Sequence, residues 1–182
     1  MFEKSNYVFY GKHGDIISKL TNEIDEKSHF RIFKRNVDVL FIAPIVGYLW
    51  NKRSQKDGNS VDSDDNKKIN YEQLQTNKDI INFNYQLIML LHDKNKIDDK
   101  ERINRAFRYG SKEPKRLECD QIYESYILGG LEILKEKILD NSVTVDDYLK
   151  KMYKFIDEYH NRQEMKNINT DDLLKLFVDE KQ

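Results

Sequence analysis

Apolar residues recur every three or four positions along most of this chain, a spacing that predicts amphipathic helices. In the first such segment, Asp15–Glu26, one helical face carries four of them: Ile16, Ile17, Leu20 and Ile24. The same pattern predicts further helices over Val37–Trp50, Asn77–Leu91, Asp98–Tyr109, Pro114–Leu139, Thr144–Tyr159 and Thr170–Val178. The chain is therefore predicted to be all-α, a single compact domain of six or seven helices over residues 1–182, with a short extended segment near Tyr7 and a polar internal loop at 51–70.

Glycine and proline modify this pattern at two places. Gly129 and Gly130 interrupt the longest predicted helix, where each glycine costs about 1 kcal/mol relative to alanine. Such a cost predicts either a kink or another helix packed closely against the glycines. Pro44 lies inside the helix predicted to follow an Asn36 cap, and it predicts a kink or a break there.

Composition limits the classes of function. The 182 residues hold 31 Lys and Arg against 32 Asp and Glu, so any basic binding surface must be regional. The single cysteine, Cys119, excludes an internal disulfide and a cysteine-based zinc site. The N-terminus lacks the pattern of a signal peptide, and the longest apolar run, Val39–Trp50, is shorter than the roughly 20 residues of a bilayer span. We therefore expect a cytoplasmic protein without a membrane partner.

One stretch is locally basic, with seven cations against Glu101 and Glu113: Lys100, Arg102, Arg105, Arg108, Lys112, Lys115 and Arg116. Phe107 and Tyr109 lie among the cations, and this combination favours binding to phosphates and bases of RNA or DNA. On a regular helix the three central arginines, three residues apart, form one stripe. The alternative interpretation is a solvated face whose arginines pair with nearby carboxylates.

A second basic region contains no acid and is interleaved with Phe30 and Phe33; its cations are Lys27, Arg31, Lys34 and Arg35. If the fold places it beside the first stretch, the two would form a single basic groove for nucleic acid or a protein partner. The alternative is that the two phenylalanines, three residues apart, only anchor the core.

Motifs for catalysis or for a cofactor are missing from the sequence. There is no phosphate-binding glycine loop and no nucleophile elbow, and the histidines lack metal-ligand spacing, so we expect neither a metal nor a cofactor. The G-x-x-G form at Gly11–Gly14 is expected to be a tight turn before a helix. A non-enzymatic protein is favoured; should the chain be a nuclease, Glu101, Arg105 and His92 are the first candidates for acid, phosphate clamp and base.

Two blocks of the sequence resemble a known group of proteins. The first runs from Phe30 and Phe33 through Val37–Ala43 and Gly47 to Asn51–Arg53, and the second spans Glu124–Leu134. Together they resemble the small Dnd-system-associated proteins that accompany bacterial DNA phosphorothioation and restriction genes. The resemblance implies a role near DNA modification or phage defence and transfers no catalytic residues.

The leading hypothesis is therefore a helical protein of phage–host conflict that binds a nucleic-acid-handling effector, such as a Cas nuclease, or its RNA or DNA. Anti-CRISPR inhibitors provide the analogy, since they are commonly small, single-domain and free of motifs. Two alternatives stay open: a nuclease-type enzyme acting on RNA or DNA, for example on guide RNA, and a helical module that binds only protein.

Overall fold

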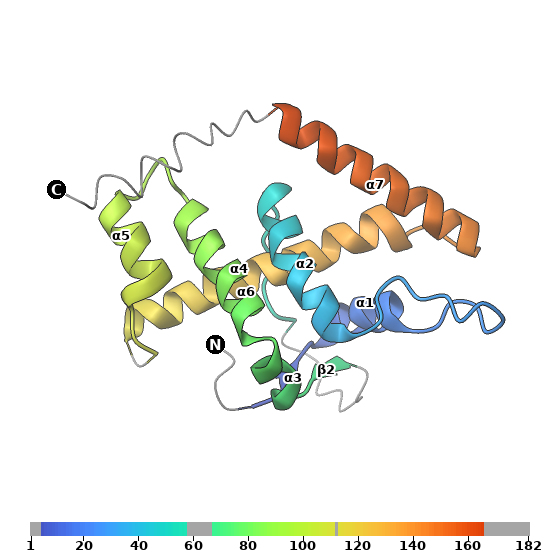
Figure 1. Ribbon diagram of the computed structural model, residues 1–182, viewed down its shortest axis with the longest axis horizontal. Helices are drawn as coiled ribbons and strands as arrows, with labels where there is room; N and C mark the ends of the chain where they lie inside the picture. The colour runs from blue at the N-terminus through green and yellow to red at the C-terminus, as the bar shows by residue number, and fades with distance from the viewer. Residues whose placement is uncertain (1–4, 58–66, 112, 166–182) are drawn as a thin grey trace. The chain divides into compact units, whose positions relative to one another are not determined.

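The computed structural model describes residues 5–57, 67–111 and 113–165, without the side chains of residues 162–165. These residues are 67% helical and 4% strand and contain seven α-helices, which confirms the predicted all-α fold (Figure 1). By their internal contacts the residues divide into two compact units, 1–141 and 142–182, and each is described by itself. The single domain over the whole chain stays a prediction.

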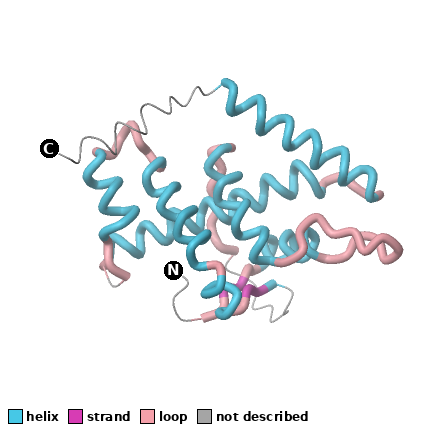
Figure 2. The backbone as a smooth tube through the Cα atoms, viewed as in Figure 1, coloured by secondary structure: helices cyan, strands magenta, loops and turns pink. Residues whose placement is uncertain are grey.

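The N-terminal segment is extended, as expected. Strand β1 (Tyr7–Val8) pairs antiparallel with β2 (Lys68–Ile69), the minor sheet shown in Figure 2. β2 falls within the predicted 51–70 loop, of which residues 58–66 lie outside the described residues. Helix α1 (Gly11–Thr21) begins four residues before the predicted start, so the G-x-x-G residues are its first turn rather than a separate turn.

The core of unit 1 is the pair formed by α2 (Asn36–Leu49) and α6 (Pro114–Leu134), in which three glycines let the backbones meet. A Cβ atom added to Gly47 would overlap the carbonyl oxygen of Tyr126, and one added to Gly130 would overlap that of Ala43. Gly129 faces the carbonyl oxygen of Lys52 in the same way. Close packing therefore explains the two glycines of α6. It is one of the two possibilities, a kink or close packing, that the sequence predicted.

Two expectations about α2 change. The helix begins at Asn36 itself, whose side chain donates to the carbonyl oxygen of Lys68 at 2.9 Å instead of capping α2. The helix also continues through Pro44, so of the predicted kink or break the break is wrong. Asn84 of α4 (Lys78–Leu91) donates to the carbonyl oxygen of Phe41, one turn before the proline, and so joins the two helices.

Of the remaining helices of unit 1, α1 and α4 pack against both members of this pair. A short helix that was not predicted, α3 (Tyr71–Thr76), precedes α4. The predicted helix over 98–109 consists of α5 (Asp99–Ile103) and a π-helical turn, η2 (Asn104–Arg108), and α6 likewise ends in a π-helical turn, η3 (Lys135–Leu139). On α4, Phe83 is a large apolar residue that is 63% exposed.

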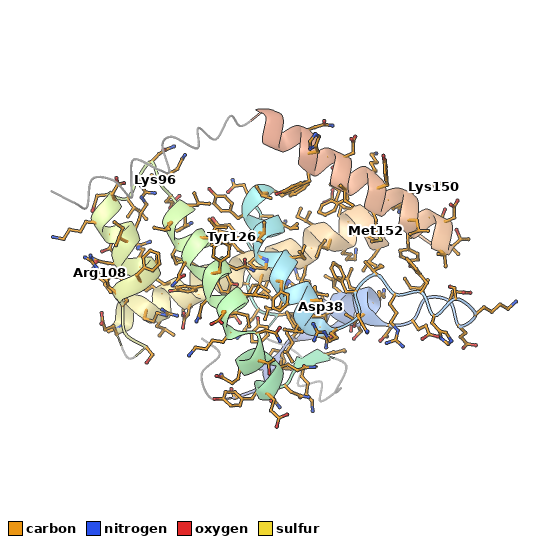
Figure 3. All side chains as sticks on the ribbon, viewed as in Figure 1. Asp38, Lys96, Arg108, Tyr126, Lys150 and Met152 are labelled. Atoms are coloured by element: carbon orange, nitrogen blue, oxygen red, sulfur yellow. The ribbon has the colours of Figure 1, made fainter. Side chains whose placement is uncertain are left out.

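The described part of unit 2 contains α7 (Val145–Met165). Thr144 caps this helix as predicted, because its hydroxyl accepts the backbone N–H of Asp147 at 3.2 Å while the Asp147 carboxylate accepts the N–H of Thr144 at 2.9 Å. Lys150, labelled in Figure 3, pairs with Asp146 one turn away at 2.6 Å. The predicted helix over Thr170–Val178 lies outside the described residues.

Candidate functional site

The predicted arginine stripe does not form, because Arg102 turns into the protein. Its guanidinium donates to the carbonyl oxygen of Leu90 at 2.6 Å and also pairs with Asp99, and the residue is 8% exposed. Leu90 lies in the last turn of α4, where backbone carbonyls lack helical partners, so Arg102 acts as a cap for that helix. Arg102 is thus corrected from a surface cation to a structural one. The π-helical turn that follows further shifts the angular spacing of Arg105 and Arg108.

Arg105 and Lys115 share one carboxylate. Glu101 accepts from Arg105 at 3.2 Å, pairs with Lys115 at 3.5 Å and accepts the hydroxyl of Tyr109 at 2.5 Å. The Tyr109 hydrogen bond, helped by Arg105 and Lys115, lowers the pKa of Glu101. Lys115 also lies over the Tyr109 ring, 5.2 Å from its centroid. Much of the predicted positive charge is therefore neutralised within the segment.

Arg116 is also held locally. Its guanidinium donates to Asp120 at 3.0 Å, one turn along α6, and lies 4.2 Å from the centre of the Tyr85 ring. An arginine fixed between a carboxylate and an aromatic ring has little freedom to reach a ligand. Lys112 lies outside the described residues.

What remains at the surface is a smaller set, here named the α5–η2 basic surface: Lys100, Phe107 and Arg108. Lys100 and Arg108 are exposed and neither pairs with a carboxylate of the described residues; Arg108 contacts only the side-chain oxygen of Asn104, at 3.5 Å. The Phe107 ring is 54% exposed. Figure 3 shows Arg108 at the outer edge of unit 1.

The second basic region lies elsewhere. Arg31 pairs with Glu23 at 2.9 Å and Arg35 with Asp38 at 2.6 Å, while Lys27 and Lys34 are exposed. The region belongs to the loop between α1 and α2, at the end of unit 1 opposite to α5 (Figures 1 and 2). The condition for a single basic groove is therefore not met.

The catalytic candidates do not form one site. His92 is buried, bonds to the Tyr126 hydroxyl at 3.0 Å and faces Asp93 at 3.6 Å. Burial lowers the pKa of His92, with Asp93 acting in the opposite direction. Glu101 and Arg105 bond to each other and not to His92. His92 therefore takes its hydrogen-bond partner from α6, and Glu101 and Arg105 take theirs from their own segment.

A cluster that the sequence analysis did not predict centres on Glu132 of α6. Its carboxylate accepts from the Ser54 hydroxyl at 2.6 Å and pairs with Lys12 at 2.8 Å and with Lys52 at 3.4 Å. The His13 ring nitrogen Nε2 lies 3.3 Å away. Burial opposes ionisation, yet the hydrogen bonds from Lys12 and Ser54 lower the pKa of Glu132 to about 2.

Three segments supply the Glu132 cluster: the start of α1, the chain after α2, and α6. His13 is 1% exposed, and burial lowers its pKa although the nearby Glu132 carboxylate acts in the opposite direction. A sequence signal existed, since Glu132 is the one charged residue in the apolar run Tyr126–Leu134. Buried acids need partners, and these come from positions 78 and 119 residues away.

A second carboxylate of α6 lies in the same neighbourhood. Glu124 pairs with Lys56 at 2.8 Å and accepts the hydroxyl of Tyr7 at 3.0 Å. Arg53 donates to the Ser125 hydroxyl at 2.9 Å and lies 5.7 Å from the centre of the Tyr126 ring. Together with the Glu132 cluster, these contacts arrange four cations along one side of α6.

Two features are absent from the residues that the structure describes, a metal-binding cluster and a membrane-spanning helix. Within 5–57, 67–111 and 113–165, no three His, Cys, Asp or Glu side chains come together in a way that could hold a metal ion. In the same ranges no helix combines the length and the apolar character that crossing a bilayer demands. Comparisons with protein families, with curated proteins and with solved structures find no match to this chain.

Proposed function

We propose that this protein binds nucleic acid through the α5–η2 basic surface and catalyses no reaction on it. The observation that supports the proposal is the exposed Phe107 ring in the same short segment as Lys100 and Arg108, two cations without a carboxylate partner among the described residues. Unpaired cations bind phosphates with release of counterions, and an exposed ring stacks on an unpaired base. RNA or DNA with single-stranded regions is therefore the partner that suits this surface.

The biological setting of the proposal rests on the resemblance to the Dnd-associated proteins. Its two sequence blocks contain α2 and the C-terminal part of α6, the helices that pack through Gly47 and Gly130. We infer a role in phage–host conflict, in which the bound nucleic acid belongs to a DNA-modifying or RNA-guided effector. A Cas-type nuclease and its guide RNA are one such partner.

The test compares two double variants that change the net charge equally. Lys100→Glu with Arg108→Glu alters the α5–η2 basic surface, and Lys27→Glu with Lys34→Glu alters the opposite end of unit 1. Fluorescence anisotropy with a labelled structured RNA and a labelled single-stranded DNA measures affinity. The first pair should lower affinity at least about tenfold, since each phosphate contact is charge-assisted, and the second no more than about threefold.

Each alternative has its own outcome in this experiment. Equal losses for the two pairs would show that only net charge matters and would remove the α5–η2 surface from the proposal. Shortened RNA on a denaturing gel, abolished by Glu101→Gln, would make the protein a nuclease instead.

One observation favours a protein partner as the second candidate. Leu117, in the first turn of α6, is 61% exposed. Exposed apolar side chains beside cations are common at protein interfaces. Absence of RNA and DNA binding at low salt, together with capture of a purified effector that Leu117→Ser abolishes, would favour this candidate over nucleic acid.

A further inference from the structure

A cavity of about 720 Å³ lies between the start of α1 and the segment that follows α2. Its lining contains three cations, Lys12, Arg53 and Lys56, and one carboxylate, Asp57; the other lining residues are two serines and a glutamine. Sites for drug-like molecules are lined mostly by apolar residues with a few polar groups, whereas every residue that lines this cavity is polar or charged. Its chemistry suits a compact, highly charged anion and offers no ring on which a base could stack.

Two of the three cations can turn to a ligand without leaving a carboxylate alone. The Lys12 and Lys56 side chains are 56% and 50% exposed, so their ammonium groups already reach solvent. If Lys12 moves, Glu132 keeps Lys52 and Ser54; if Lys56 moves, Glu124 keeps the hydroxyl of Tyr7. The carboxylates therefore position the lysines near the cavity without depending on them.

The third cation is already oriented. The Arg53 guanidinium donates through Nε to the Ser125 hydroxyl, at 2.9 Å, and lies over the Tyr126 ring. This leaves its terminal nitrogens as donors for an oxygen ligand at the cavity. Arginine donors in a fixed plane match the geometry of phosphate oxygens.

The protein already places an anion at this point. The backbone N–H of Lys12, in the first turn of α1, points at the Asp57 carboxylate, with 3.4 Å between N and Oδ2. A helix N-terminus favours negative charge. Asp57 thus shows that the cavity accepts an anionic oxygen at the helix end, and it would compete with a ligand for the same place.

We propose that this cavity binds the polyphosphate group of a small ligand, a diphosphate or triphosphate, through Lys12, Arg53 and Lys56. The site shares no residue with the α5–η2 basic surface, so it does not depend on the proposed nucleic-acid binding. Free polyphosphate and the phosphate chain of a nucleotide have the same chemistry here. Because the lining consists of polar and charged residues, we expect the cavity to recognise the phosphates and not the base.

Isothermal titration of the full chain with pyrophosphate, tripolyphosphate, ATP, AMP and inorganic phosphate tests the proposal. Binding should be saturable for pyrophosphate, tripolyphosphate and ATP, and at least about tenfold weaker for AMP and inorganic phosphate, which make fewer charge-assisted contacts. ATP and tripolyphosphate of equal affinity would identify the phosphate chain alone as the ligand. AMP binding as tightly as ATP would overturn the proposal.

The variants separate this site from general charge effects. Lys12→Gln and Lys56→Gln should each weaken pyrophosphate binding at least about tenfold, while Lys19→Gln, an exposed lysine on the same helix, should leave it unchanged. Asp57→Asn should strengthen binding severalfold, because it removes the competing carboxylate. Lack of saturable pyrophosphate binding by a wild-type protein with normal thermal unfolding, or equal losses for Lys12→Gln and Lys19→Gln, would contradict the proposal.

Discussion

The two halves of α6 are stabilised by different kinds of contact. Near its N-terminus Arg116 pairs with Asp120 one turn away, and the neighbouring α5–η2 segment neutralises itself in the same local manner. In the C-terminal half, glycines pack against α2 and Glu132 binds residues of α1 and of the chain after α2. Local pairs adjust the surface charge at little gain in stability, whereas the long-range contacts hold the segments of unit 1 together.

The largest expected effect is at the glycine contact. Gly130→Ala should lower the free energy of unfolding by about 3 kcal/mol, because its Cβ would overlap the backbone of Ala43 and the helices must separate. The matched control is Gly110→Ala, whose Cβ would lie at an ordinary 3.4 Å from Glu113. Urea denaturation should show a change below about 0.5 kcal/mol for the control. Equal midpoints for the two variants would mean that the close contact between Gly130 and α2 does not stabilise the protein.

The two carboxylate clusters provide the next comparison. Glu132→Gln should cost about 2 kcal/mol at pH 7, because a partly buried charge loses contacts to two other segments, the start of α1 and the chain after α2. Glu101→Gln should cost about 1 kcal/mol or less, since its partners lie in the same segment and at the surface. Chemical denaturation of both variants under one set of conditions measures the difference, and a larger loss for Glu101→Gln would reverse the ranking.

Acid should lower the stability of the protein by protonating Glu132. Its folded-state pKa of about 2 lies below the ordinary value of 4.5, so the unfolded state binds the proton more readily. The stabilisation is fully present above pH 4.5 and is lost as the pH falls towards 2. Unfolding free energies measured across this window should fall less steeply in Glu132→Gln than in the wild type. Parallel curves would show that the Glu132 cluster does not control acid stability.

A smaller difference in stability is expected between variants of two arginines of the predicted stripe. Arg102→Ala should cost about 1.5 kcal/mol, because it leaves the carbonyl oxygen of Leu90 without its cap. Arg108→Ala should change stability by less than about 0.5 kcal/mol and should weaken nucleic-acid binding instead. Thermal unfolding and anisotropy on both variants measure the two effects. Arg102→Ala should mainly lower stability, and Arg108→Ala should mainly lower affinity.

Much of the fold was predictable because it depends on local patterns. The apolar spacing located the helices around Ile16 and Ile88, and the cost of Gly129 and Gly130 pointed to close packing. The departures have physical causes that spacing does not contain: the π-helical turn after Ile103, and the side chain of Asn36 bonding to β2 instead of capping α2.

The candidate sites were less predictable, because they depend on contacts between residues that are far apart in the sequence. A run of cations is visible in sequence, but whether Arg102 points to solvent depends on the end of α4, which is near it only in the fold. The Glu132 cluster joins residues from positions 12 to 132, and each of them alone is an ordinary surface residue type. Only the isolated acid in an apolar run signalled that partners were needed.

The salt dependence of nucleic-acid binding tests the central claim most directly. For single-stranded DNA, the logarithm of the binding constant should fall linearly with the logarithm of salt concentration, by about 0.7 for each phosphate contacted. Replacing Lys100 and Arg108 by glutamine should reduce the slope by about 1.4, while glutamine at Lys27 and Lys34 should leave it unchanged. A slope unaffected by the first pair, or affinity independent of salt, would contradict binding through the α5–η2 basic surface.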